Sequence, residues 1–243
     1  AAIHDLLGMP QAKKSALRCD TMASASFTRD EVILALDVLY FSGEAHPTAQ
    51  TAVVQELSAL LNRLPIYALE NRNDKFLNFT GVARQILLFR ASKKLGKRDP
   101  NVGARFYEID SRFEDCRGEL HSIAMAIRRN ERFFEISGFG DDAEAPDFPE
   151  GALLGHLHRI VETRDSAKLA LRKRCEICQI DTSDIYPHCS NLMSMHLAVP
   201  ITELDGNRRY QAKEFITVCP NCHAALHRRR PWLTKENCGE LLR

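Results

Sequence analysis

The sequence has no apolar run long enough to cross a membrane, no evident secretory signal at its start and almost no net charge, at +1. These absences argue against a membrane-spanning or secreted protein, and against a chain that binds nucleic acid through overall basicity. Charge is instead distributed unevenly. From Gly151 onward 14 Lys and Arg accompany 10 Asp and Glu, whereas the preceding residues have 19 against 22. The later part also holds six of the nine histidines, so we expect the chemistry of the protein to lie there. Because no secretory signal is evident, we expect a cytoplasmic protein.

Four of the eight cysteines form two Cys-x-x-Cys pairs, Cys175/Cys178 and Cys219/Cys222. This pairing, without a secretory signal, favours a reducing compartment and a metal over disulfides. Four thiolates suit one structural Zn²⁺ in tetrahedral coordination. The alternative is four buried free cysteines. The cysteines outside the pairs are expected to be free thiols: Cys19, Cys116, Cys189 and Cys238.

The second cysteine pair runs directly into His223 and His227. Residues four apart on a helix lie on one face, so both imidazoles would point to the same place. This spacing predicts a second metal beside the zinc. The alternative is a zinc finger in which a histidine replaces a cysteine as structural ligand.

The stretch from Cys175 to Pro231 resembles the HNH (ββα-metal) nuclease family, in its McrA-like branch. The resemblance rests on a histidine-bearing segment that ends near a proline (194–201), a second strand (213–219) and the Cys-x-x-Cys-His-x-x-x-His helix. It implies metal-dependent hydrolysis of DNA, and a restriction-type activity on modified DNA is one form that this hydrolysis could take. By resemblance His196, His223 and His227 bind the catalytic divalent ion, which is Mg²⁺, Mn²⁺ or Ni²⁺.

The sequence departs from the family pattern at the general base, where Leu197 replaces the second histidine of the pair. Leucine cannot accept a proton, and general acid–base catalysis contributes about 10²–10⁴-fold. Two alternatives stay open: a one-residue slip that puts His196 on the base position, or a base supplied by His188. In the gap-free alignment, which puts Leu197 at the base position, Leu197→His would raise any cleavage rate. Ser194 stands where the family often has Glu, and Glu214 where it has Asn or Asp.

The part before the linker is expected to be helical. A capping box at Thr28 and Glu31 starts the first helix, which ends at Gly43. Hydrophobic spacing predicts further helices over 51–64, 80–95 and 113–130. Residues 58–65 and 76–82 resemble a helical module that often precedes HNH domains, with Leu77 where Arg is usual. Such a module either binds DNA phosphates, through Arg84, Lys93 and Lys94, or serves packing or dimerisation.

Residues 137–151 are rich in Gly, Pro and acidic side chains, which is typical of a linker. A helix is expected over 153–174, with His156 and His158 at its surface and Arg172–Arg174 in its last turn. Beyond the metal motif, Arg228, Arg229 and Arg230 could contact phosphates, or could simply be a charged helix end. A short closing helix is expected over 233–242.

Together these patterns predict a mainly α protein with a small α+β domain. Its expected parts are an unassigned extension (1–26), a helical module (27–136), a linker (137–151) and an HNH endonuclease domain (152–243). The expected partner is DNA, and a homodimer is an open alternative. Two functions compete with the nuclease: a degenerate HNH protein that binds DNA without cutting, and a zinc-organised interaction module.

Overall fold

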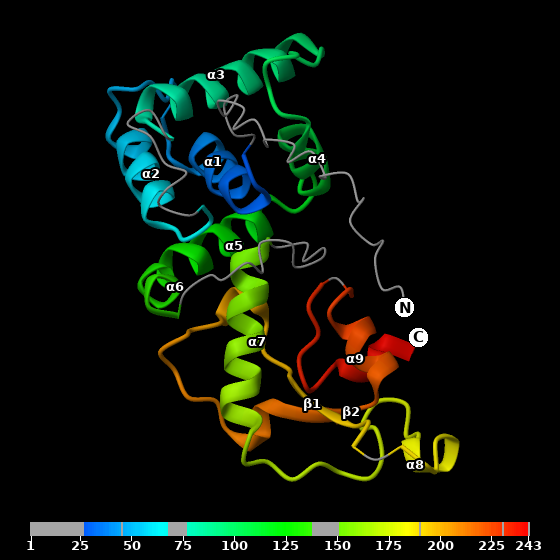
Figure 1. Cartoon of the computed structure of the whole chain (residues 1–243). Coiled ribbons are helices and arrows are strands. Elements are labelled where there is room, and N and C mark those ends of the chain that lie inside the picture. Colours follow the sequence, from blue (N-terminus) through cyan, green and yellow to red (C-terminus); the bar gives the residue numbers. More distant parts are fainter. Residues whose placement is uncertain are drawn as a thin grey trace, which may run out of the picture.

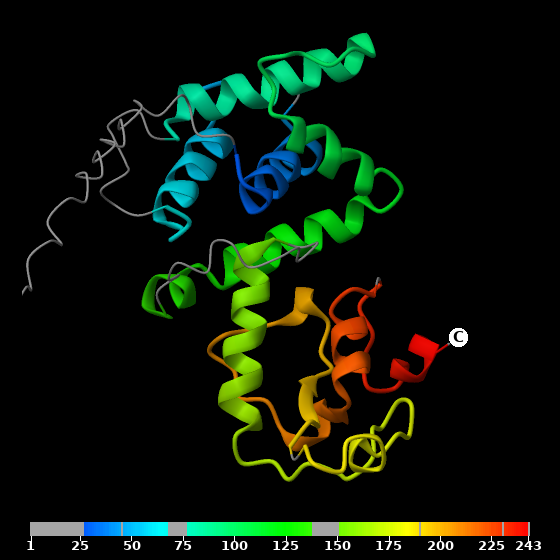
Figure 2. The ribbon, with the colours of Figure 1, turned by 45° about the vertical axis from the view of Figure 1, so that its right-hand side comes forward.

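The computed structural model describes residues 27–44, 46–67, 77–137, 151–189, 191–229 and 231–242. The described chain is mainly helical with one small two-stranded antiparallel sheet, as predicted. Figures 1 and 2 show the first six helices at one end of the molecule and the sheet with the carboxy-terminal helices at the other. The expected extension (1–26) and nearly all of the expected linker (137–151) lie outside the described residues.

The amino-terminal helices are α1 (Arg29–Phe41), α2 (Ala52–Arg63), α3 (Phe79–Leu95), α4 (Ala104–Arg112), α5 (Arg117–Arg129) and α6 (Glu131–Ser137). The remaining elements are α7 (Ala152–Ser166), α8 (Thr182–Ile185), β1 (Ser194–Leu197), η3 (Ile201–Glu203), η4 (Ala212–Glu214), β2 (Phe215–Val218), α9 (Pro220–Leu226) and η5 (Cys238–Leu242), where η denotes a 3-10 helix.

Helix α1 is the central element of the helical part, with α2, α3, α4 and α5 packed around it (Figure 1). The predicted capping box is present: the Thr28 backbone N–H donates to Glu31 Oε2 at 2.6 Å, and the Glu31 N–H donates to Thr28 Oγ1 at 3.4 Å. The predicted helices over 51–64 and 80–95 are confirmed as α2 and α3. Gly96 ends α3 in the left-handed conformation that glycine adopts without strain.

The helix predicted over 113–130 is present as α5, which starts four residues later than predicted, and α4 and α6 flank it as separate helices that were not predicted. Cys116 has a non-helical backbone conformation and starts α5, and Asn130 ends it. The fully buried Asn130 side chain donates to the Leu204 carbonyl at 2.9 Å and accepts from the Gly206 N–H at 2.8 Å. This tertiary contact stabilises the helix end and ties it to the loop between β1 and β2.

One hydrophobic core runs through both ends of the molecule. It includes Leu34 of α1, Ile123 of α5, Leu157 of α7 and Leu197 of β1. A second, smaller cluster surrounds the cysteine pairs and includes Val218, Leu226 and Leu233. The predicted helical module and carboxy-terminal part therefore share a core, and the cysteine-rich end has a small core of its own.

The start of α7 is held against α1 by a buried carboxylate. Asp30 accepts hydrogen bonds from the backbone N–H groups of Ala152 at 2.9 Å and Leu153 at 3.5 Å. These are free donors of the first turn of α7, so Asp30 caps that helix from another element. Gly151 lets the backbone approach Asp30, because it has a φ of 99° and a Cβ there would lie 2.0 Å from Asp30 Oδ1.

Replacing Gly151 by alanine is expected to destabilise the protein by at least about 1–3 kcal/mol, because both the positive φ and the contact with Asp30 become strained. Chemical denaturation of the purified chain measures the change. Gly118→Ala is the matched control: its Cβ meets nothing within 4 Å, and alanine favours the helix by about 0.5–1 kcal/mol. Equal unfolding midpoints for Gly151→Ala and the unmodified protein would show that this contact is not required.

The helix predicted over 153–174 ends early, at Ser166, so Arg172–Arg174 do not lie in its last turn. The chain beyond it instead follows the edge of β2. The Arg172 N–H donates to Thr217 Oγ1 at 3.2 Å, and the Glu176 N–H donates to the Thr217 carbonyl at 2.9 Å. Pairing with the sheet edge satisfies the backbone groups that a longer helix would have used.

Strands β1 and β2 pair antiparallel, with His196 opposite Ile216 and Ser194 opposite Val218. Both are shorter than the predicted strands over 194–201 and 213–219. Pro200 follows β1, and α9 starts directly after Cys219. Among the described helices, none combines the length and apolar character that crossing a membrane requires.

Candidate metal centres

The four paired cysteines converge on one point. One ligand atom from each of Cys175, Cys178, Cys219 and Cys222 lies within 4.8 Å of the others, and the Sγ atoms of Cys178 and Cys219 are 3.6 Å apart. In a tetrahedral Zn²⁺ site with Zn–S bonds of about 2.3 Å, sulfur atoms are about 3.8 Å apart. The cluster could therefore hold a zinc ion with all four positions filled by protein.

Backbone geometry shapes the first half of this centre. The Cys175 N–H donates to the Ile180 carbonyl at 3.0 Å, and Gln179 turns the chain with a left-handed φ of 62°. Burial raises the pKa of the Cys175 thiol, but the backbone N–H groups around its sulfur, chiefly that of Cys178, outweigh burial and lower the pKa to about 7. A thiol with a lowered pKa reaches the thiolate state that metal binding requires more readily.

A second cluster lies beside the first and consists of Glu162, His196, His223 and His227, with one ligand atom from each within 4.8 Å of the others. His196 comes from β1, whereas His223 lies in α9 and His227 is its C-cap. The three histidines predicted to share an ion are therefore brought together. The ring centres of His196 and His223 are 5.2 Å apart, and those of His223 and His227 are 4.7 Å apart.

Glu162 and His158 of α7 belong to this neighbourhood, although neither was predicted from the sequence. Glu162 Oε1 lies 3.3 Å from His196 Nδ1, and Glu162 Oε2 lies 3.6 Å from His223 Nε2. The prediction that His158 is a surface residue is wrong, since it is fully buried with its ring centre 5.4 Å from that of His196. Their four-residue spacing, which places both on one face of α7, is the signal that could have identified them.

Hydrogen bonds hold these side chains in place. Ser194 Oγ lies 2.8 Å from His223 Nδ1, so the other ring nitrogen, Nε2, faces the cluster. The Leu197 N–H donates to Glu162 Oε1 at 2.9 Å, and His158 Nε2 lies 3.1 Å from the Leu197 carbonyl. Such contacts around a metal ligand fix its orientation and tautomer.

Burial sets the protonation states in the cluster. Burial, reinforced by the neighbouring His158 ring, lowers the pKa of His227 to about 3, and burial lowers the pKa of His158 to about 4. Burial alone would raise the pKa of Glu162, but its contacts with His196 and His223 hold the pKa well below the usual range. At neutral pH His158 and His227 are therefore neutral and Glu162 is ionised, which are the states that bind metals.

The other predicted active-site residues lie outside the cluster. Glu214 pairs with Arg208, and its Oε2 accepts from the Gln211 N–H at 2.8 Å. His188 is exposed in its loop. Leu197 is fully buried in the large core, and adjacent residues of a strand point to opposite faces, so its side chain faces away from that of His196. A histidine at 197 would therefore enter the core rather than the cluster.

The basic residues predicted to contact DNA do not form one surface. Arg84 and Lys94 are exposed on α3, at the far end of the molecule from α9 in both views (Figures 1 and 2). Lys93 forms an ion pair with Asp110. Arg228 is exposed just beyond His227, and Arg229 is half-buried. Arg230 lies outside the described residues. Among these residues, Arg228 and Arg229 are the nearest in sequence to the cluster, because they directly follow His227.

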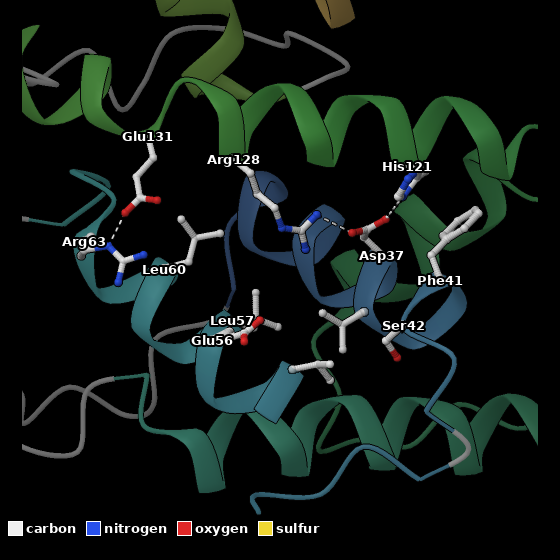
Figure 3. Close-up of a pocket in the computed structure, with 12 residues that line it drawn as sticks. Asp37, Phe41, Ser42, Glu56, Leu57, Leu60, Arg63, His121, Arg128 and Glu131 are labelled. Carbon is white, nitrogen blue, oxygen red and sulfur yellow. Dashed lines mark hydrogen bonds and ion pairs between the residues drawn. The ribbon is translucent and has the colours of Figure 1, made fainter. Parts of the chain in front are cut away.

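A cavity of about 440 Å³ lies in the helical part, between α1, α2 and α5 (Figure 3). Most of its charged side chains contact one another: Asp37 binds both His121, at 2.7 Å, and Arg128, and Arg63 pairs with Glu131. The Phe41 ring stacks on His121 with ring centres 4.5 Å apart. Since these charges are already paired, the cavity offers a ligand fewer binding groups than the metal cluster does.

Comparisons of the chain with protein-family models, with curated proteins and with solved structures found no match. The geometry of the two clusters and the cysteine–histidine motif are therefore the features that bear on function.

Proposed function

We propose that the protein is a metal-dependent endonuclease that hydrolyses DNA phosphodiester bonds. The observation that supports this proposal is the second cluster. A zinc knuckle needs only its four cysteines to hold a structural ion, whereas here His196, His223 and His227 also meet at a second point beside it. One short helix, α9, supplies ligands to both centres, so the first ion would position the ligands of the second.

In this proposal the three histidines would hold a divalent ion, and the four cysteines a structural Zn²⁺. When bound, the divalent ion supplies Lewis-acid stabilisation of charge on the scissile phosphate. Ser194 keeps His223 oriented with Nε2 toward the ion. Arg228, exposed after α9, would contact a DNA phosphate near the cluster, and the net positive charge of the chain after Gly151 would favour DNA on this side.

A second function, DNA binding without cleavage, is favoured by one observation. The residue at the usual position of the general base, Leu197, is buried in the core and cannot accept a proton. Loss of a general base costs about 10²–10⁴-fold in rate. Such a protein would keep both metal centres and the salt-dependent contacts with phosphates.

A plasmid-nicking assay separates the two functions. The full chain, loaded with Zn²⁺ in the cysteine centre, is mixed with supercoiled plasmid and Mg²⁺, Mn²⁺ or Ni²⁺, using DNA with and without modified cytosines. We expect nicking that depends on the added ion and stops with chelator. The absence of nicking with every ion, together with a gel shift that weakens as salt rises, would replace the nuclease by the binding function. The absence of both would reject both.

A further inference from the structure

The carboxylate of Glu162 lies at the distance from the histidines that a shared ion requires. In a tetrahedral Zn²⁺ site with bonds of about 2.0–2.1 Å to nitrogen or oxygen, neighbouring ligand atoms are about 3.3–3.4 Å apart. Glu162 Oε1 is 3.3 Å from His196 Nδ1, and Oε2 is 3.6 Å from His223 Nε2. Glu162 therefore occupies the place of a fourth ligand.

The buried nitrogens of the cluster give an independent indication of a ligand. Nε2 of His196, whose side chain is 1% exposed, forms no hydrogen bond, and the Glu162 carboxylate is the neighbour of Nδ1 of His196 and Nε2 of His223. Leaving a buried polar atom unsatisfied costs about 1–3 kcal/mol. A metal ion at the centre of the cluster would remove this cost.

Glu162 is also fixed in this position rather than free to swing in solvent. Its side chain is only 13% exposed, and its Oε1 accepts the Leu197 N–H of β1 at 2.9 Å. Helix α7, which carries it, packs directly against β1 (Figure 1). The carboxylate is thus held where it meets the histidines by two elements that belong to the large core.

We infer that Glu162 is the fourth protein ligand of the second ion, and that it caps the coordination position that a DNA phosphate would need. Catalytic zinc sites keep one of four positions open, whereas a zinc site with four protein ligands is closed. With a four-coordinate ion held by all four side chains, the carboxylate of Glu162 would have to move away before a DNA phosphate could bind. The capping role rests on the proposed nuclease function, whereas the ligand assignment does not.

Cobalt binding tests the ligand assignment without relying on cleavage. The full chain is given one equivalent of Zn²⁺, which fills the cysteine centre, and is then titrated with Co²⁺, whose visible absorption is stronger in four-coordinate than in higher-coordinate sites. For Glu162→Gln we expect at least about tenfold weaker Co²⁺ binding and weaker absorption as water enters, with the knuckle zinc retained. Glu56→Gln, the same change at an exposed residue of α2, should alter neither. Unchanged affinity and spectrum in Glu162→Gln would overturn the assignment.

Two further measurements complete the test. If Glu162→Gln fails to retain the knuckle zinc, Glu162→Asp is the second variant, because it keeps the charge but draws the carboxylate oxygens back by one methylene. We expect Glu162→Asp to bind Co²⁺ more weakly than the unmodified protein. An unchanged Co²⁺ affinity in Glu162→Asp would count against the assignment. At saturating Co²⁺, Glu162→Gln should nick plasmid faster than the unmodified protein, and slower nicking would overturn the capping role. Weakened Co²⁺ binding without nicking by either protein would leave Glu162 as a ligand and reject the nuclease function.

Discussion

Cys222→Ser is expected to lower the metal content of the protein at both centres. Apparent zinc-binding free energies of structural sites are about 10–16 kcal/mol, comparable with the whole stability of a domain at about 5–15 kcal/mol. The small core around the cysteines cannot replace that contribution. Because Cys222 is followed directly by His223 in α9, loss of the first ion should also release the second. Metal analysis and limited proteolysis of residues 171–242 measure the effect.

Cys189→Ser is the matched control, since Cys189 is exposed and lies outside both clusters. It should leave metal content and protease resistance unchanged. The helical part should keep its fold in Cys222→Ser, because its core is formed by other residues, and circular dichroism should show most of the helix signal retained. Full metal content in Cys222→Ser would contradict a tetrathiolate centre.

His223→Ala is expected to remove the second ion while the knuckle zinc stays. His223 contributes one of three imidazoles, and its loss should weaken the second site by at least about 100-fold, more than the 10–100-fold typical of losing a residue that only supports a ligand. Plasmid nicking should fall to background. His223 is a better choice than His196, whose side chain is 1% exposed, because truncation of a buried ring would also disturb packing.

His188→Ala provides the control for His223→Ala, because it removes an exposed histidine of the same part of the chain that is not in the cluster. Metal content and nicking should match the unmodified protein. Unchanged nicking in His223→Ala would separate cleavage from the second cluster, and loss of nicking in His188→Ala would revive this loop histidine as the general base.

Features encoded by neighbouring residues could be predicted from the sequence. The Thr28–Glu31 capping box, the left-handed Gly96 and the cysteine pairs each depend on residues a few positions apart. The shared face of His223 and His227 is likewise a consequence of helical spacing. The approach of His196 to these two histidines was expected from the family resemblance, and the three side chains lie together in the cluster.

The features that could not be predicted depend on contacts between distant elements. Helix α7 stops at Ser166 because the following chain pairs with the edge of β2, and no Gly or Pro marks that point. The four-residue spacing of His158 and Glu162 places them on one face of α7, but only the packing of α7 on β1 brings that face to the three histidines. The burial of Leu197 has the same origin, since a strand sequence does not say which face the rest of the chain covers.

The metal content of the unmodified chain tests the central claim most directly. Protein purified without chelator and loaded with Zn²⁺ is passed through a desalting column, and zinc is measured against protein by elemental analysis. The two clusters predict two tightly held ions per chain, one of them lost in His223→Ala. One ion per chain, unaffected by His223→Ala, would show that the histidines and Glu162 bind no metal.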